Sequence, residues 1–249
     1  MSIHIFDNGI QIYDHHILEP QRVRYSHCNV HEEDEEQAFF DTIHALPQGS
    51  CYASIGTAVG YYPLLARKLR PDLRICCLEP LPRHRQFFQD NISLNGYNAA
   101  DFELYNLAVS THDSQVTLVD QDYRSFLTAA APISRARQLA RRLLHRQPRQ
   151  PRLQVEAIAL ANLFSRLNTP TIALAQMDIQ GHEEAVLRAY FRTAAGSRQR
   201  VEWFLVGTHG DAIHSACAHL LQANGYTLLI DDPDTQHQPD GILLARLHP

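Results

Sequence analysis

Residues 51–62 read Cys-Tyr-Ala-Ser-Ile-Gly-Thr-Ala-Val-Gly-Tyr-Tyr. The apolar run 51–55 enters a turn with glycines at positions 56 and 60, and a helix is expected to follow at 61–69. The two glycines let the backbone turn sharply and let a ligand approach main-chain amides at the positive N-terminal end of that helix. This stretch therefore predicts the first strand, turn and helix of a nucleotide-binding type of fold.

An acidic residue follows the next predicted strand. Glu79 comes about 20 residues after the turn and closes the apolar run 73–78. At the carboxyl end of a parallel strand, a carboxylate can accept hydrogen bonds from both hydroxyls of a ribose. The turn and Glu79 together indicate a ligand that contains a nucleoside.

Predicted strands and helices alternate along most of the chain. The predicted strands are 51–55, 73–78, 102–109, 153–158, 171–179, 201–206, 226–230 and 241–247. The predicted helices between them are 61–69, 82–94, 160–167, 183–191 and 213–223. With right-handed crossovers this order predicts an α/β fold built on a mostly parallel, seven-stranded sheet. The last two strands are joined by a turn-rich loop and predict an antiparallel edge.

Two segments lie outside this alternation. Residues 1–30 alternate apolar and polar side chains around the turn Asp7-Asn8-Gly9, which predicts an N-terminal hairpin extension. The domain proper is expected over 31–249, with a helical insertion at about 110–157 that contains a strand at 115–119 and a basic helix at 133–145. That helix is either a lid that attracts an acidic substrate or a solvated face, and we favour the solvated face. The acidic run 31–36 is interpreted as the start of an amphipathic helix whose dipole it complements.

The composition excludes several classes of protein. The chain has 249 residues, of which 45% are hydrophobic, and its net charge of −5 gives no general reason to expect a nucleic-acid partner. No apolar run is long enough to span a membrane, and the five cysteines lack the spacing of a zinc site. We therefore expect a cytoplasmic protein of one domain, with reduced cysteines and no metal ligand set. A homo-oligomer is left open.

Polar residues gather at the predicted carboxyl ends of the strands, where an open parallel sheet binds its ligand. A nicotinamide dinucleotide is one candidate, but its pyrophosphate requires three glycines in the spacing G-x-G-x-x-G, and Gly56 and Gly60 are spaced differently. S-adenosylmethionine has a ribose and no pyrophosphate, so the looser turn is sufficient for it. The spacing favours S-adenosylmethionine.

Five segments resemble the FkbM family of S-adenosylmethionine-dependent methyltransferases. They are 54–62, Leu78-Glu79-Pro80, Asn106-Leu107-Ala108-Val109, Met177-Asp178-Ile179-Gln180-Gly181-His182-Glu183 and Asp240-Gly241. The resemblance covers approximately residue 51 to the C-terminus. It implies a class I, Rossmann-like methyltransferase fold and a small-molecule acceptor, because the family commonly methylates hydroxyls of sugars, polyketides and related secondary metabolites.

The resemblance also assigns roles to residues. Gly56 and Gly60 would shape the methionine side of the cofactor pocket, Glu79 would hold the ribose, and Asp178 would lie beside the transferring methyl group. The expected cofactor-binding residues are Ser54, Gly56, Thr57, Gly60, Tyr61, Glu79, Pro80, Asn106, Leu107, Ala108, Asp178 and Gln180. Two positions depart from the family pattern, because the family usually has Asp in place of Ser54 and Asn in place of Ala58.

His209 is the preferred general base, because imidazole titrates near neutrality, and Asp178 would orient it or replace it. His182 is a third candidate and is discounted because it lies within a helix start. A metal-assisted reaction remains an alternative, although only Asp178 is clearly placed as a ligand. Another is a noncatalytic adenosyl-binding protein, suggested by Ser54 and Ala58. RNA modification would depend on the basic segment 135–152 alone and is not expected.

Overall fold

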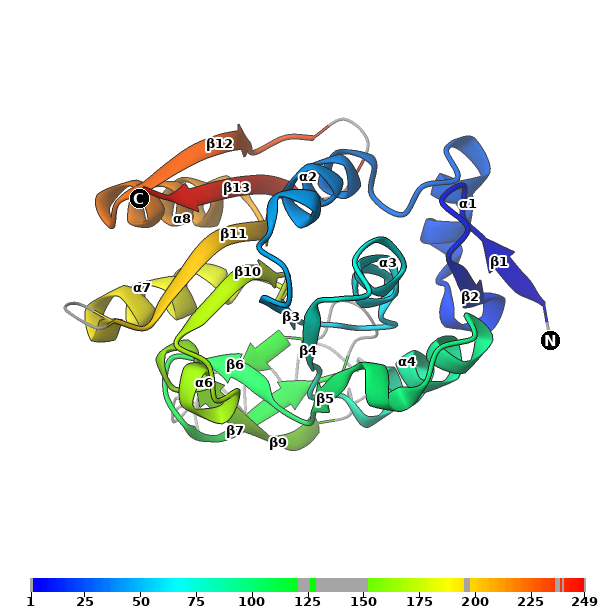
Figure 1. Ribbon diagram of the computed structural model, residues 1–249, viewed down its shortest axis with the longest axis horizontal. Helices are drawn as coiled ribbons and strands as arrows, with labels where there is room; N and C mark the ends of the chain where they lie inside the picture. Colours follow the sequence, from blue (N-terminus) through cyan, green and yellow to red (C-terminus); the bar gives the residue numbers. More distant parts are fainter. Residues whose placement is uncertain are drawn as a thin grey trace, which may run out of the picture.

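The computed structural model describes residues 2–120, 126–128, 152–194, 198–235, 238 and 240–248. In these residues a seven-stranded sheet forms the centre of the fold, with the strand order β12-β13-β11-β10-β3-β4-β5 (Figure 1). The strands are β3 (Cys51–Ile55), β4 (Arg74–Leu78), β5 (Glu103–Tyr105), β10 (Thr171–Met177), β11 (Arg200–Thr208), β12 (Tyr226–Asp232) and β13 (Gly241–Leu247). Neighbouring strands pair in parallel except β13, which is antiparallel to β11 and β12. The predicted mostly parallel sheet with an antiparallel edge is confirmed.

Helices cover both faces of this sheet. Side chains of successive strand residues point to opposite faces, and because the central strands β3, β4 and β10 are mostly apolar, both faces must be buried. Tyr52 packs into the cluster under α2 (Glu33–Ala45), α3 (Tyr61–Leu69) and α4 (Pro82–Leu94). The next residue, Ala53, packs into the cluster on the other face. That cluster includes residues of α6 (Leu160–Arg166), α7 (Glu183–Ala194) and α8 (Asp211–Ala223). The sheet is therefore doubly wound.

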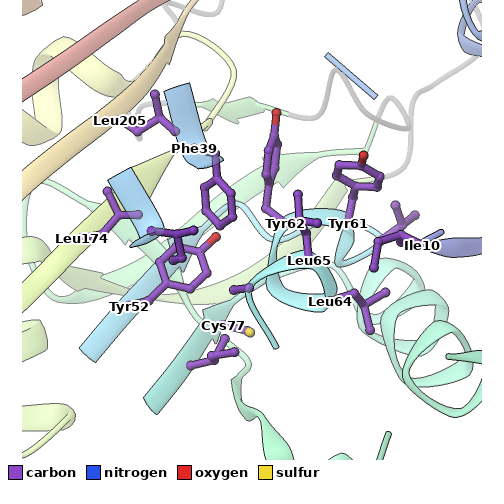
Figure 2. Packing of buried hydrophobic residues seen from close by; sticks show 14 of the residues in the cluster. Ile10, Phe39, Tyr52, Tyr61, Tyr62, Leu64, Leu65, Cys77, Leu174 and Leu205 are labelled. Carbon is purple, nitrogen blue, oxygen red and sulfur yellow. The ribbon is translucent and has the colours of Figure 1, made fainter. Parts of the chain in front are cut away.

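Aromatic side chains fix α2 on the sheet. The ring centroid of Phe39 lies 5.5 Å from that of Tyr52 and 5.0 Å from that of Tyr62. Figure 2 shows Phe39 among these two residues and the strand residues Leu174 and Leu205. Phe39 is fully buried, so its packing anchors the helix and places the first turn of α2 near the ends of β10 and β11.

A second sheet departs from the prediction. Its order is β6-β9-β7-β8, formed by β6 (Ala108–Ser110), β9 (Arg152–Ala159), β7 (Ser114–Val119) and β8 (Phe126–Thr128). The single strand predicted over 102–109 is wrong, because it divides into β5 and β6, which belong to different sheets. The strand predicted at 153–158 likewise joins the second sheet. An apolar run in the sequence indicates that a strand is buried, but it does not indicate which sheet the strand joins. In the structure, Ala108 is buried against Leu118 and Ala157 of the second sheet.

The N-terminal residues form the predicted hairpin and one helix that was not predicted. The strands β1 (Ile3–Ile5) and β2 (Gln11–Tyr13) pair antiparallel, and a short 3-10 turn leads to α1 (Glu19–His27). In α1 only Tyr25 is buried, so the helix lacks the apolar periodicity by which it could have been recognised. A second 3-10 turn, η2 (Ala99–Asp101), precedes β5. The basic helix predicted at 133–145 lies outside the described residues.

All five cysteines are free; four of them are buried, and Cys28 is partly exposed. Among the helices that the structure describes, none combines the length and apolar character needed to cross a membrane.

Candidate active site

A cavity of about 720 Å³ opens at the carboxyl ends of β3, β4, β10 and β11. It lies where the strand order reverses between β3 and β10, which is the usual ligand position in open α/β sheets. The predicted site residues that line it are Ser54, Gly56, Thr57, Tyr61, Glu79, Pro80, Leu107, Ala108, Asp178, Gln180 and His209. Most of the residues selected from the sequence are therefore brought together in one cavity.

Two of the predicted residues are not among the lining residues. Gly60 lies at the start of α3, where a Cβ atom would come within 1.9 Å of the Phe88 ring, so this position serves the packing of α3 on α4. Asn106 is exposed and its side-chain oxygen accepts a hydrogen bond from Arg85. His182, the discounted base, is also outside the lining and contacts Ser110, with 3.3 Å between His182 Nε2 and Ser110 Oγ.

The turn after β3 is held by main-chain contacts on both sides. The amides of Gly56 and Thr57 donate to the carbonyl of Leu78, at 3.0 and 3.2 Å. Gly56 has a φ of +85°, and a Cβ atom there would lie 1.9 Å from the carbonyl oxygen of Asp178. Only glycine allows the turn to approach the end of β10 this closely.

Glu79 connects the turn to the end of β4. Its side chain is buried, and its Oε2 accepts from the amide of Ala58 at 2.8 Å while its Oε1 accepts from the amide of Leu81 at 2.9 Å. Ala58 has a φ of +49°, a left-handed conformation that Asn adopts more readily than Ala. Each carboxylate oxygen keeps a further lone pair, so Glu79 can still accept from a ligand in the cavity.

Glu183, Asp178 and His209 form a connected group across β10, α7 and β11. Glu183 is fully buried, and its Oε1 accepts from the amides of Ile179 and Gly181 and from Nδ1 of His209, at 3.1, 3.0 and 3.0 Å. The other ring nitrogen, Nε2, lies 3.5 Å from Oδ1 of Asp178 and 3.4 Å from Oδ1 of Asp240. Glu183 was not predicted as a site residue, because an acid in the first turn of a helix has a simpler explanation in the helix dipole.

These neighbours shift the pKa values of the group. Burial acts to lower the pKa of His209, but the hydrogen bond to Glu183 and the charges of Asp178, Glu183 and Asp240 outweigh it and raise the pKa to about 9. Burial raises the pKa of Asp178 to about 6, and Asp240 and Glu183 add to this while His209 opposes it. Near neutral pH, His209 is therefore a cation and Asp178 is mostly ionised.

The same three residues could hold a cation. Asp178, Glu183 and His209 each offer one ligand atom, and these atoms lie within 4.8 Å of one another. The sequence identified only Asp178 in such a position. Against a ligand role, Oε1 of Glu183 already accepts from two amides and an imidazole, so this oxygen orients His209 instead.

The acidic run at the start of α2 has a role that its sequence did not reveal. Glu32 and Glu35 line the cavity, whereas they had been interpreted only as complements of the helix dipole. Glu35 is buried, and Oε1 accepts from Nε2 of Gln176 at 2.7 Å. Burial raises the pKa of Glu35 to about 8, and Asp178 and Asp240 add to this while Gln176 and His209 oppose it. The helix dipole alone would have left this carboxylate exposed.

The strand order and the position of the cavity define a class I, Rossmann-like methyltransferase fold. The chain belongs to the FkbM methyltransferase family, because the model of that family, the methyltransferase FkbM domain, matches residues 51–226. The resemblance inferred from the sequence is confirmed.

The solved structures that are similar to this chain include three proteins described as methyltransferases. A methyltransferase FkbM from Methylobacillus flagellatus KT is 9% identical with a TM-score of 0.50, over 80% of this chain and 44% of that chain. A putative methyltransferase from Streptococcus mutans, in complex with SAH, is 8% identical with a TM-score of 0.49, over 85% and 96% of the two chains. A precorrin-6y C5,15-methyltransferase from Geobacter metallireducens GS-15 is 15% identical with a TM-score of 0.43, over 85% and 87%. At these identities the likeness concerns the fold alone. No curated protein matches the chain.

Proposed function

We propose that this protein transfers a methyl group from S-adenosylmethionine to a hydroxyl of a small molecule. The observation that carries this proposal is the pair Asp178 and His209, which lie 3.5 Å apart in the cavity that Gly56 and Glu79 also line. A proton acceptor beside a nucleoside site suits methyl transfer, because the acceptor hydroxyl must lose a proton as it is methylated.

The cavity suits the cofactor in its shape and in its chemistry. Its volume falls within the range of roughly 300–1,000 Å³ that small-molecule sites occupy. Glu79 would hold the ribose hydroxyls, Leu107 and Ala108 would form the apolar wall for the adenine, and the turn at Gly56 would face the methionine part. When bound, S-adenosylmethionine supplies an electrophilic methyl group on its sulfonium.

The pKa values support a division of roles within the catalytic pair. With a pKa of about 9, His209 is an imidazolium near neutral pH and has no lone pair with which to take a proton. Asp178, with a pKa of about 6, is largely ionised under the same conditions. We therefore assign the general base to Asp178, and His209 would orient it and stabilise its charge. This reverses the preference that the sequence suggested.

The test is Asp178→Asn, assayed as formation of S-adenosylhomocysteine with a panel of hydroxyl-bearing acceptors. Loss of the base should reduce turnover by about 10²–10⁴-fold, while the affinity for S-adenosylhomocysteine changes little. Asp211→Asn is a matched control, because Asp211 is exposed at the start of α8 outside the cavity. Wild-type turnover in Asp178→Asn would show that Asp178 is not the base. Binding of S-adenosylhomocysteine without turnover on any acceptor would favour the noncatalytic alternative.

A metal-assisted transfer is the second candidate, favoured by the short separations among Asp178, Glu183 and His209. A divalent cation held there would lower the pKa of an acceptor hydroxyl. Activity that is lost with EDTA and restored by magnesium would select this mechanism. Activity that is unchanged by EDTA would select direct proton transfer to Asp178.

A further inference from the structure

Carboxylates crowd one end of the cavity, which we call the acidic end and define by Glu32, Glu35, Asp178 and Asp240. Two cations also line this end. Arg24 lies 3.7 Å from Glu32, and His209 lies between Asp178 and Asp240. Glu35 forms an ion pair with neither of them, and it is the deepest of the four acids, with 3% of its surface exposed.

A hydrogen-bond chain fixes the orientation of Glu35. The hydroxyl of Tyr52 donates to Oε1 of Gln176, and Nε2 of Gln176 then donates to Oε1 of Glu35 at 2.7 Å. Because its oxygen faces Tyr52, the amide of Gln176 must present its nitrogen to the carboxylate. One oxygen of Glu35 is thus occupied, and the side chain is held in a single orientation.

The other oxygen of Glu35 accepts no hydrogen bond from the described residues. This atom, Oε2, lies above Gly207 of β11, where a Cβ atom would be 3.7 Å from Oε2 and 3.6 Å from Cβ of Asp178. The missing side chain at Gly207 leaves room in front of both acids. Oε2 is not one of the enclosed polar atoms of the structure, so it opens to the cavity that Glu35 lines and is free to accept from a donor that a ligand supplies.

We propose that Glu35 is the counter-ion of an ammonium group that binds at the acidic end of the cavity. The inference rests on the proposed methyl transfer, and it adds a chemical requirement to the ligands of that site. An ammonium fits better than a divalent cation, because the donor nitrogen of Gln176 leaves Glu35 only one oxygen and such cations prefer several. Two sources are available, namely the amino group of the cofactor's methionine part and an amine on the acceptor.

The titration of Glu35 supplies a readout that packing alone would not produce. Its raised pKa of about 8 leaves the carboxyl mostly protonated near pH 7. The titratable groups that face it are Glu32, Asp178, Asp240, His209, Tyr52 and Tyr62. An ammonium at Oε2 favours the ionised form, so the complex should release a proton when the ligand binds.

The first experiment is calorimetry with S-adenosylhomocysteine and with 5′-methylthioadenosine, which lacks the amino acid. If the cofactor supplies the ammonium, Glu35→Gln should lower the affinity for S-adenosylhomocysteine at least tenfold. The affinity for 5′-methylthioadenosine should stay unchanged. Proton release, measured in buffers of different ionisation enthalpy, should disappear in the variant. Glu33→Gln is the matched control, since Glu33 lies exposed in the same turn. Gly207→Ala keeps the Glu35 carboxylate but occupies the space beside its Oε2, so this variant should also lower the affinity for S-adenosylhomocysteine.

The second experiment tests the acceptor as the source. The Tm of the protein saturated with S-adenosylhomocysteine is measured in the presence of ethanolamine, which carries an amine, or of ethylene glycol, which does not. An increase in Tm that requires the amine and is lost in Glu35→Gln would assign the ammonium to the acceptor. If the wild type binds S-adenosylhomocysteine and neither experiment responds to Glu35→Gln, the inference is overturned. Failure of the wild type to bind either adenosyl compound would overturn the proposed function as well.

Discussion

Nδ1 of His209 lies 3.0 Å from Oε1 of Glu183, and this contact joins the end of β11 to the first turn of α7. Glu183 is fully buried, so its charge acts on the imidazole with little screening by solvent. Because the carboxylate accepts from Nδ1, it fixes the ring with Nε2 directed at Asp178 and Asp240. The contact therefore determines both the charge and the orientation of His209.

The pH dependence of methyl transfer should be bell-shaped. Asp178 must be ionised to accept a proton, so kcat/KM should rise as the pH passes about 6. His209 must stay protonated to hold Asp178, so kcat/KM should fall as the pH passes about 9. The measurement is a pH–rate profile with an acceptor that does not titrate between these values. A rate that falls with increasing pH through 6 would contradict the assignment.

Glu183→Gln should make the stability less dependent on alkaline pH. The pKa of His209 is raised from 6.5 to about 9 on folding, so its stabilising effect is complete below 6.5 and is lost as the pH rises through 9. For the wild type this loss is at most about 3 kcal/mol, at about 1.4 kcal/mol per pKa unit. Urea unfolding of both proteins at pH 6.5 and 9.5 measures it, and other titrating groups largely cancel in the difference. Equal losses would show that Glu183 does not set the pKa.

Gly56→Ala should abolish cofactor binding and destabilise the fold. The added Cβ would meet the carbonyl oxygen of Asp178 at 1.9 Å, and we expect a cost of roughly 3 kcal/mol or more. Gly49→Ala is the control, because Gly49 also has a positive φ but has nothing within 4 Å of an added Cβ. It should cost about 1 kcal/mol and leave binding intact. Thermal unfolding and calorimetry with S-adenosylhomocysteine separate the two effects.

Glu79→Gln should lower the affinity for the cofactor by weakening the contact with its ribose. In the wild type, Glu79 accepts from the main-chain amides of Ala58 and Leu81. Glutamine can accept only one of these hydrogen bonds, because its side-chain nitrogen is a donor. We expect at least a tenfold loss of affinity for S-adenosylhomocysteine. The wild type should discriminate against the 2′-deoxy analogue, and the variant should lose that discrimination. If the variant discriminates as the wild type does, Glu79 does not contact the ribose.

Much of the fold could be predicted because the relevant signals are local. The helix 61–69 begins at a glycine turn and the helix 82–94 begins at a proline, and both have the bounds that their sequences suggested. The division between β5 and β6 could not be predicted, because Leu104 and Tyr105 are followed, after the single polar residue Asn106, by the apolar residues 107–109. Burial looks the same in sequence whether a residue packs in one sheet or in the next.

The site was predictable where chemistry and strand ends coincide, as at Gly56, Glu79 and Asp178. The site was not predictable where an acidic residue could serve either the helix dipole or the site. Glu35 and Glu183 both lie in the first turn of a helix, where acids are common for the dipole alone. Only its contact with Gln176, 141 positions away, ties Glu35 to the cavity wall. Only its contact with His209, 26 positions away, connects Glu183 to a residue that lines the cavity.

The break between β5 and β6 separates the floor of the cavity from one of its walls. Gly56, Glu79 and Asp178 stand on the seven-stranded sheet, whereas Ala108 and Leu118 belong to the second sheet. The second sheet therefore carries one wall of the cavity and contributes nothing to its floor at Gly56, Glu79 and Asp178. A change in the packing of Ala108 and Leu118 should reshape that wall while the floor keeps its geometry.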